Sequence, residues 1–292
     1  MGQGIFKNVA AKAKLEAWYD RFLLKIAAPF ERRTVSTACG PSHVLVVGNA
    51  SNPPLVCVHG ALGSSAHAAS ERGPLVERFQ VFLPDVPGQS VRGTEMRLSL
   101  DTDAHARWLV DVINALGLTE VNLYGVSWGG YIALQTALAL RGRVRKLVLL
   151  VPAGLVGGSA WAGITQVAIP LTRYRCFPNE KNLQAFYNGL FSTWDADWAH
   201  YLGDAVQSFV LNLRAPPLAR KAEFSGYETP TFVLGGRDDV HFRGDRLIER
   251  AKDLMPHAHV AVLDKCKHGP PTTTEFRTWM ADRVTAFILN QN

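Results

Sequence analysis

Short apolar runs, rich in valine and leucine, recur along most of the chain and alternate with longer stretches in which apolar residues repeat at helical spacing. The runs predict eight strands, at about residues 33–38, 43–48, 55–59, 80–84, 121–125, 146–151, 230–235 and 259–264. Helices are predicted near residues 66–78, 101–116, 128–141, 244–255 and 272–290. A turn-rich link at residues 39–42 predicts an antiparallel hairpin at the start. This order predicts an α/β fold whose single, mostly parallel sheet is flanked by helices.

The long interval between the predicted strands at 146–151 and 230–235 contains no strand pattern. It is rich in aromatic residues, because the 64 residues from Trp161 to Phe224 hold 11 of the 28 in the chain. Two interpretations are open: the aromatics form the core of a small helical insertion, or they line an apolar pocket beneath a helical lid. We expect a helical cap at residues 153–227, inserted into an α/β core of residues 34–152 and 228–292.

Residues 1–33 precede the first strand and show apolar positions at imperfect helical spacing, with lysines between them. They predict an amphipathic helical extension. Docking on the domain is the favoured interpretation, with a membrane-surface contact or a homodimer contact through residues 1–33 as alternatives. This segment has seven basic and three acidic residues, so it carries +4 of the net charge of +6 and leaves +2 for the other 259 residues. The main body is therefore not a basic nucleic-acid-binding domain.

Composition narrows the class of protein further. A chain of 292 residues with 47% hydrophobic and 19% charged residues suits one large globular domain with an insertion. Its four cysteines lie far apart, without the spacing of zinc sites, and predict free thiols and no metal site. No apolar run is long enough for an integral membrane span, and the N-terminus lacks the apolar core of a secretory signal. We expect a cytoplasmic location.

The strongest motif is the sequence Gly125-Val126-Ser127-Trp128-Gly129, which stands between an apolar strand pattern and a helical one. A G-x-S-x-G motif in this setting predicts a sharp strand-to-helix turn with the serine at its tip. Glycine is needed on both sides of the serine because side chains at these two positions would collide in so sharp a turn. Ser127 is therefore the predicted nucleophile, with the positive end of a helix beneath its hydroxyl group.

A serine hydroxyl group needs a base, and the base needs an orienting acid. His268 is the best-placed histidine, because it lies in a short loop just past the last predicted strand. Asp238 and Asp239 both follow the penultimate strand, and Asp239 is preferred as the acid, while Asp238 is an alternative or a brace of the loop. Together Ser127, His268 and Asp239 predict a catalytic triad.

An oxyanion formed at this serine would need preplaced donors. The glycine-rich stretch from His59 to Ser65 follows an apolar strand, so its backbone can approach a ligand closely. We assign the oxyanion hole to the backbone N–H groups of Ala61 and Trp128. His59 is expected to hold this loop by hydrogen bonds rather than to act as a second base.

These segments together resemble the α/β-hydrolase fold superfamily. The resemblance covers roughly residues 34–290 and rests on five segments in family order: residues 59–63, 85–90, 125–130, 236–239 and 266–269. It implies an eight-stranded sheet with a helical cap after the sixth strand, and similarity to capped carboxylesterase-like and C–C-bond hydrolases. Ser127 in place of aspartate argues against the dehalogenase and epoxide hydrolase branches. Gln89 replaces a common glycine, and residues 269–275 lack the acidic-then-proline pattern of many relatives.

The expected function is that of a cofactor-independent serine hydrolase. Its substrate would be an ester, thioester or lactone of an apolar or aromatic small molecule, cleaved through an acyl-enzyme on Ser127. One alternative is hydrolysis of a C–C bond in a diketone-type substrate by the same triad, and a weaker one is perhydrolase or haloperoxidase-like activity. A non-catalytic ligand-binding protein on the same scaffold is the alternative outside the enzymes.

Overall fold

The computed structural model describes residues 4–212 and 214–290 and contains one eight-stranded sheet, in the order β1-β2-β4-β3-β5-β6-β7-β8. The strands are β1 Phe30–Thr37, β2 Gly40–Val47, β3 Pro54–Val58, β4 Gln80–Pro84, β5 Val121–Val126, β6 Val144–Leu150, β7 Thr231–Gly236 and β8 His259–Leu263. The pairs β1–β2 and β2–β4 are antiparallel, and all the others are parallel. The predicted mostly parallel sheet is confirmed.

The first strand begins three residues before its predicted start, inside the segment expected to be a helical extension. The strand starts earlier because it pairs with β2 along its whole length, from the pair Phe30–Val47 to the pair Thr37–Gly40. The polar residues Glu31, Arg32 and Arg33 are exposed on this edge strand, where charges discourage pairing with another chain.

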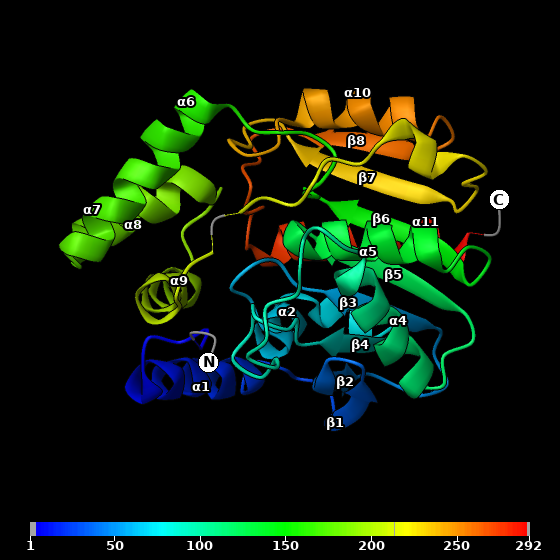
Figure 1. Cartoon of the computed structure of the whole chain (residues 1–292), viewed down its shortest axis with the longest axis horizontal. Helices are drawn as coiled ribbons and strands as arrows, with labels where there is room; N and C mark the ends of the chain where they lie inside the picture. The colour runs from blue at the N-terminus through cyan, green and yellow to red at the C-terminus, as the bar shows by residue number, and fades with distance from the viewer. Residues whose placement is uncertain (1–3, 213, 291–292) are drawn as a thin grey trace.

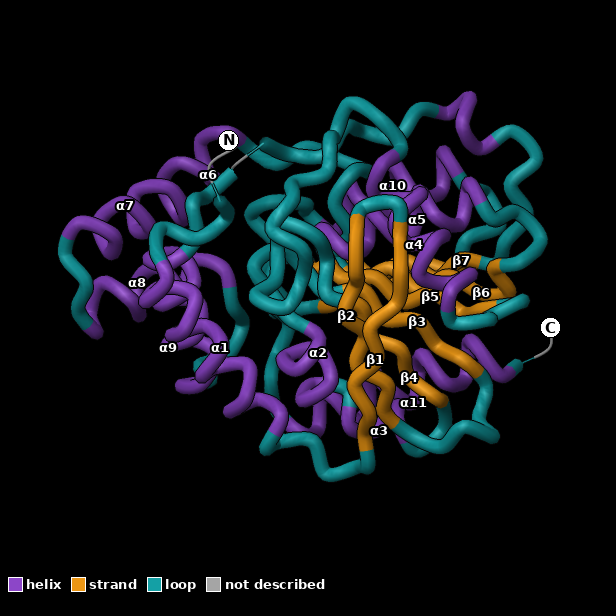
Figure 2. The backbone as a smooth tube through the Cα atoms, turned by 60° about the horizontal axis from the view of Figure 1, so that its bottom comes forward, coloured by secondary structure: helices purple, strands orange, loops and turns teal. Residues whose placement is uncertain are grey.

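Helices cover both faces of the sheet (Figure 2). They are α1 Val9–Leu23, α2 Ser65–Glu71, α3 Gly73–Val76, α4 Ala104–Ala115, α5 Trp128–Ala139, α6 Ala160–Gly163, α7 Ile169–Cys176, α8 Glu180–Leu190, α9 Ala196–Ser208, α10 Gly244–Leu254 and α11 Thr274–Leu289. A π-helical turn, Ile164–Ala168, joins α6 to α7, and a 3₁₀ turn spans Lys221–Phe224. No helix in the described ranges is long and apolar enough to cross a membrane.

Alternate residues of the central strands supply two separate hydrophobic cores. In β3, Val56 and Val58 face the core that α4, α5 and α10 cover, whereas Leu55 and Cys57 face the core beneath α2, α3 and α11. Burial on both faces explains why these strands are continuous apolar runs rather than alternating ones.

Helices α6–α9 occupy the interval between β6 and β7, lie beside the sheet (Figure 1), and are called the cap below. They have a small core of their own, built from Tyr174, Leu183, Phe186, Tyr187, Ala199, Leu202 and Val206. Both interpretations of the aromatic residues apply, since Tyr187 belongs to this core, while Phe191 and Trp198 line a cavity. Trp161 and Phe177 do neither, because both are exposed.

Helix α1 packs against α2 and α9, so the extension docks on the domain and on the cap. Its apolar side, which includes Tyr19 and Phe22, is buried. Asp204 of α9 accepts hydrogen bonds from Lys14 Nζ (3.1 Å) and Trp18 Nε1 (2.8 Å). Asp197, in the first turn of α9, pairs with Arg21 of α1 and with Lys25, two residues beyond the end of α1. Much of the basic charge of the extension is thus neutralised within the chain. Residues 1–3 lie outside the described range. A homodimer contact through residues 1–33 stays a prediction.

Candidate active site

Ser127 lies at the turn between β5 and α5 and has a left-handed backbone with φ of 53°. The neighbouring glycines are sterically required. A Cβ at Gly125 would stand 2.4 Å from the carbonyl oxygen of Gly129, and one at Gly129 would stand 2.2 Å from the carbonyl oxygen of Val58. A side chain at Gly125 would therefore collide with the turn itself, as the motif predicts. A side chain at Gly129 would collide with the backbone of β3 instead. This crowding holds Ser127 at a fixed place above the sheet.

The structure brings Ser127, His268 and Asp239 into one hydrogen-bonded chain. Ser127 Oγ lies 2.8 Å from Nε2 of His268, and Nδ1 of the same ring lies 2.9 Å from Oδ2 of Asp239. Ser127 follows β5, Asp239 follows β7 and His268 follows β8. The three meet because parallel strands present their carboxyl ends at one edge of the sheet. In this arrangement His268 can accept the serine proton while Asp239 orients the ring.

Asp239 is buried, with 1% of its surface exposed. Its Oδ1 accepts hydrogen bonds from the backbone N–H groups of His241 (2.7 Å) and Phe242 (3.0 Å). Burial acts to raise the pKa of Asp239, but His268 and the two N–H donors outweigh it, so the pKa lies below its usual value. Asp238, by contrast, is exposed and contributes its N–H to the carbonyl oxygen of Cys266 (2.9 Å). Asp239 is therefore the carboxylate in contact with the imidazole, and Asp238 braces the loop through its backbone.

His59 holds the glycine-rich loop, as the sequence predicts. Its Nε2 accepts the N–H of Val86 (3.0 Å), and its Nδ1 donates to the carbonyl oxygen of Gly60 (2.8 Å). Burial lowers the pKa of His59, which keeps the ring neutral and suits one donor and one acceptor nitrogen.

The two assigned oxyanion donors, Ala61 and Trp128, border the same cavity as Ser127. Trp128 is the first residue of α5, where backbone N–H groups have no partner within the helix. Within the described ranges, no acceptor lies in hydrogen-bonding position to the N–H of Ala61. The next residue, Leu62, has a φ of 59°, and its carbonyl oxygen accepts a hydrogen bond from Tyr201 of α9. The cap thus anchors the loop that carries the Ala61 amide.

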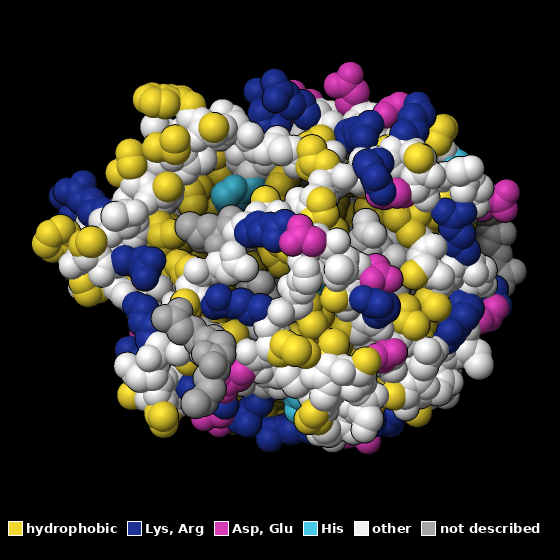
Figure 3. Space-filling model, in the orientation of Figure 1, with side chains coloured by type: hydrophobic (Ala, Val, Ile, Leu, Met, Phe, Trp, Pro, Cys, Tyr) yellow, Lys and Arg dark blue, Asp and Glu magenta, His cyan; other side chains and the backbone are white. Residues whose placement is uncertain are grey.

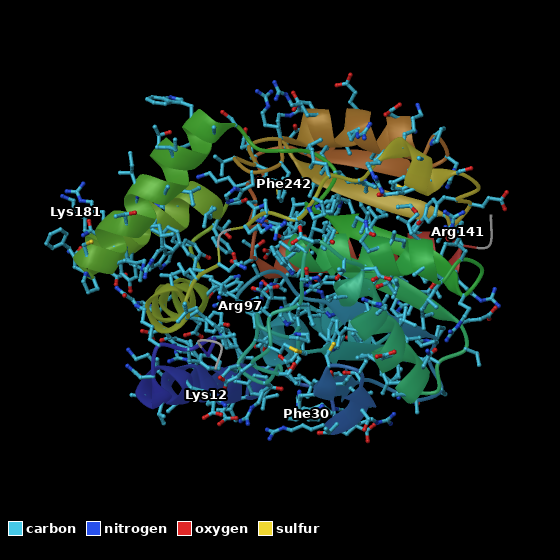
Figure 4. All side chains as sticks on the ribbon, viewed as in Figure 1. Lys12, Phe30, Arg97, Arg141, Lys181 and Phe242 are labelled. Carbon is cyan, nitrogen blue, oxygen red and sulfur yellow. The ribbon has the colours of Figure 1, made fainter. Side chains whose placement is uncertain are left out.

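A cavity of about 340 Å³ opens at Ser127 and His268 between the core and the cap. The volume is in the range of sites for small molecules. Its cap side is apolar and is formed by Val167, Leu171, Phe186, Leu190, Phe191, Trp198, Leu202 and Val206. Polar side chains at its border include Gln89, Arg97 and His241. Arg97 is labelled in Figure 4, between α1 and the centre of the molecule.

Two features of the site lie beyond the sequence prediction. The rings of His241 and Phe242 stand 4.9 and 5.4 Å from the ring of His268, centroid to centroid, and burial lowers the pKa of His241 to about 4. The carboxylate of Asp85 is buried and accepts hydrogen bonds from the backbone N–H (2.9 Å) and the hydroxyl group (2.6 Å) of Ser65. Its Oδ2 also lies 2.8 Å from Nδ1 of His43. The sequence signalled Asp85 only as part of a family segment, because its partners come from distant segments.

Comparisons with known proteins show the family of the chain. A family model described as the alpha/beta hydrolase fold matches residues 53–167. A 2-hydroxy-6-oxononadienedioate/2-hydroxy-6-oxononatrienedioate hydrolase of Burkholderia vietnamiensis is 30% identical over an alignment of 247 positions that covers 74% of this chain and 81% of that protein. The chain belongs to the α/β-hydrolase fold family.

Other members of the α/β-hydrolase fold family are similar to this chain. The uncharacterized carboxylesterase nap of Bacillus subtilis is 30% identical over 119 residues, which are 41% of this chain. That match spans only 40% of the length of the relative. The crystal structure of naproxen esterase (carboxylesterase NP) from Bacillus subtilis superposes with a TM-score of 0.80 at 20% identity, over 96% of this chain and 99% of that chain. This last likeness shows the fold.

Proposed function

We propose that this α/β-hydrolase is a cofactor-independent serine hydrolase that cleaves an ester, thioester or lactone of an apolar or aromatic small molecule. The observation that carries the proposal is the hydrogen-bonded chain from Ser127 through His268 to Asp239, open to a mostly apolar cavity. Carboxylesterase relatives agree with an ester substrate.

The first half of the reaction forms the acyl-enzyme. Nε2 of His268 accepts the hydroxyl proton as Ser127 Oγ bonds to the substrate carbonyl carbon, and Asp239 stabilises the resulting imidazolium. The N–H groups of Ala61 and Trp128 donate to the oxyanion. The tetrahedral intermediate then collapses, the bond to the leaving group breaks, and His268 gives its proton to that group.

Water completes the cycle. His268 accepts a proton from a water molecule as the water oxygen attacks the acyl carbon, and the second tetrahedral intermediate expels Ser127 Oγ, which recovers a proton from His268. The products are the carboxylic acid and the free enzyme. We propose residues 153–227 as the lid of this site, because cap residues such as Phe186 and Trp198 form one side of the cavity.

The test is the S127A substitution, assayed with p-nitrophenyl esters of increasing acyl length and with a fluorophosphonate probe. The unmodified chain is expected to turn over the esters and to be labelled, whereas S127A loses both, with turnover lower by at least about 10⁴-fold. S36A, at an exposed position of β1, is the matched control and should retain both. Labelling of S127A would overturn the assignment of the nucleophile, and tight retention of ligand without turnover by the unmodified chain would favour a binding protein.

C–C-bond hydrolysis is the second candidate. It is favoured by the Burkholderia relative, which is named as a hydrolase of 2-hydroxy-6-oxononadienedioate and of which this chain covers 81%. The same triad would serve. A vinylogous diketone substrate, assayed beside the p-nitrophenyl esters, separates the two: a kcat/KM higher for the diketone would replace the ester assignment.

A further inference from the structure

The outer surface of the cap carries an exposed apolar group that the active site does not use. Trp161, Ile164, Ile169 and Phe177 are exposed by 75%, 49%, 56% and 68%. All four lie in the short segment from α6 through the π-helical turn to the residue after α7. Exposed apolar side chains are ordinary when scattered singly, but a concentrated group on one segment marks an interaction site.

The opposite side of this segment is already occupied. Val167 and Leu171 line the cavity, and Tyr174 lies in the core of the cap. A helix on the surface of a domain normally turns its polar side outward. The side chains of this segment that pack within the chain are those on its inner side. Packing within the chain therefore does not explain the exposed apolar side chains.

Basic residues border the apolar group. Arg173, Arg175 and Lys181 are exposed, and none of them forms an ion pair within the described ranges. Figure 4 shows Lys181 at the outer end of the cap, and Figure 3 shows hydrophobic and basic side chains together there. The sequence has no acidic residue from Val121 to Asn179. The next acidic residue in the sequence is Glu180, whose Oε2 lies 3.2 Å from Nε2 of His200.

This charge differs from that of α1. Lys14 and Arg21 of α1, and Lys25 just beyond it, are paired with acids of α9, so the extension offers little free positive charge. On the cap, by contrast, Arg173, Arg175 and Lys181 are free of ion pairs in the part of the chain that the structure describes, and lie in or close to the segment that carries the exposed apolar side chains.

We propose that this outer cap patch, formed by Trp161, Ile164, Ile169 and Phe177 with Arg173, Arg175 and Lys181, binds the surface of a membrane rich in anionic phospholipid. Trp and Phe side chains partition into the boundary between headgroups and acyl chains, and Arg and Lys attract lipid phosphates. The positive charge argues against a second copy of this chain as the occupant. A two-fold contact through the patch would place its three free basic side chains against the same three on the partner. The proposal is independent of the function proposed for Ser127.

The test is sedimentation with vesicles of pure phosphatidylcholine and of phosphatidylcholine with phosphatidylglycerol, at low and high salt. The S127A protein is used beside the unmodified chain, so that lipid cleavage cannot alter the vesicles. We expect binding to the phosphatidylglycerol vesicles only, weakened by salt. R173Q/R175Q should lower the partition constant about thirty-fold, from about 1 kcal/mol for each basic residue at the surface. W161S/F177S should lower it by at least about ten-fold.

Matched controls come from exposed positions outside the patch. R246Q/K252Q removes two exposed basic residues of α10, and L218S removes an exposed apolar side chain outside the patch. All variants should unfold at the temperature of the unmodified chain, because the substituted side chains are exposed. Absence of binding to phosphatidylglycerol vesicles, equal binding to both kinds of vesicle, or equal losses in patch and control variants would overturn the proposal. A lipid-free dimer that W161S/F177S dissociates would assign the patch to a second copy and overturn it too.

Discussion

The hydroxyl group of Tyr201, on cap helix α9, donates a hydrogen bond to the backbone carbonyl oxygen of Leu62, in the glycine-rich loop beneath the cap. Tyr201 is 2% exposed and Leu62 has a left-handed backbone, so a buried contact from the cap supports an unfavourable loop conformation. Leu62 is adjacent to Ala61, the proposed oxyanion donor. A residue of α9 thus fixes the loop next to the proposed oxyanion donor.

Tyr201 is therefore expected to be a positioning residue. Y201F should lower kcat for a p-nitrophenyl ester about five-fold with little change in KM, because the Ala61 N–H loses its fixed place and one buried hydrogen bond contributes about 1 kcal/mol. Y227F is the control: the hydroxyl group of Tyr227 lies 2.9 Å from that of Thr231, away from the cavity. Equal kcat values for Y201F and Y227F would contradict the role.

The two adjacent aspartates should differ sharply in kinetics. D239N should lower kcat by about 10³- to 10⁴-fold, because it removes the charge that orients His268 and stabilises its imidazolium. D238N should change kcat by less than about three-fold, since the side chain of Asp238 is exposed and its backbone makes the loop contact. Steady-state kinetics of the pair checks this. A larger loss in D238N would identify Asp238 as the acid.

Asp85 should make stability depend on pH. Burial acts to raise its pKa, but hydrogen bonds from His43 and Ser65 and the nearby His59 lower it below the usual 3.8. A lowered carboxyl pKa stabilises the folded state above the unfolded-state pKa, and this contribution is lost as the pH falls through the folded-state pKa. D85N should lower the free energy of unfolding by about 3 kcal/mol at pH 7, and by less below about pH 4. Urea unfolding at both pH values measures this. The exposed D101N control should behave like the unmodified chain at both.

The N-terminal helix should be held mainly by its apolar side. Phe22 packs against His67, Trp198 and Tyr201, and F22A should lower the free energy of unfolding by about 3 to 4 kcal/mol. R21Q/K25Q should cost less than about 1 kcal/mol, because both side chains are largely solvated. Urea unfolding of the two variants compares them. A larger loss in R21Q/K25Q would show that the ion pairs, rather than the aromatic contacts, dock the helix.

Much of the fold could be predicted because its signals are local. The apolar runs mark the strands, and the steric demand of one sharp turn marks Gly125 and Ser127. The triad candidates follow from the same information, since residues just beyond the ends of parallel strands gather at one edge of the sheet. The starts of β1 and β2 each lie three residues before their predicted positions, because the polar and turn-forming residues there carry no apolar signal, and pairing of the two strands decided their extent.

The sequence by itself determined the class of fold, the nucleophile candidate and the order of nucleophile, acid and base, because backbone sterics and side-chain periodicity act over a few residues. Tertiary structure alone decided which aspartate faces His268, which cap aromatics line the cavity and which face solvent, and where the charge of α1 is neutralised. These outcomes depend on contacts such as Lys14 with Asp204, 190 residues apart. Such contacts exist only after the chain has folded, so no local pattern specifies them.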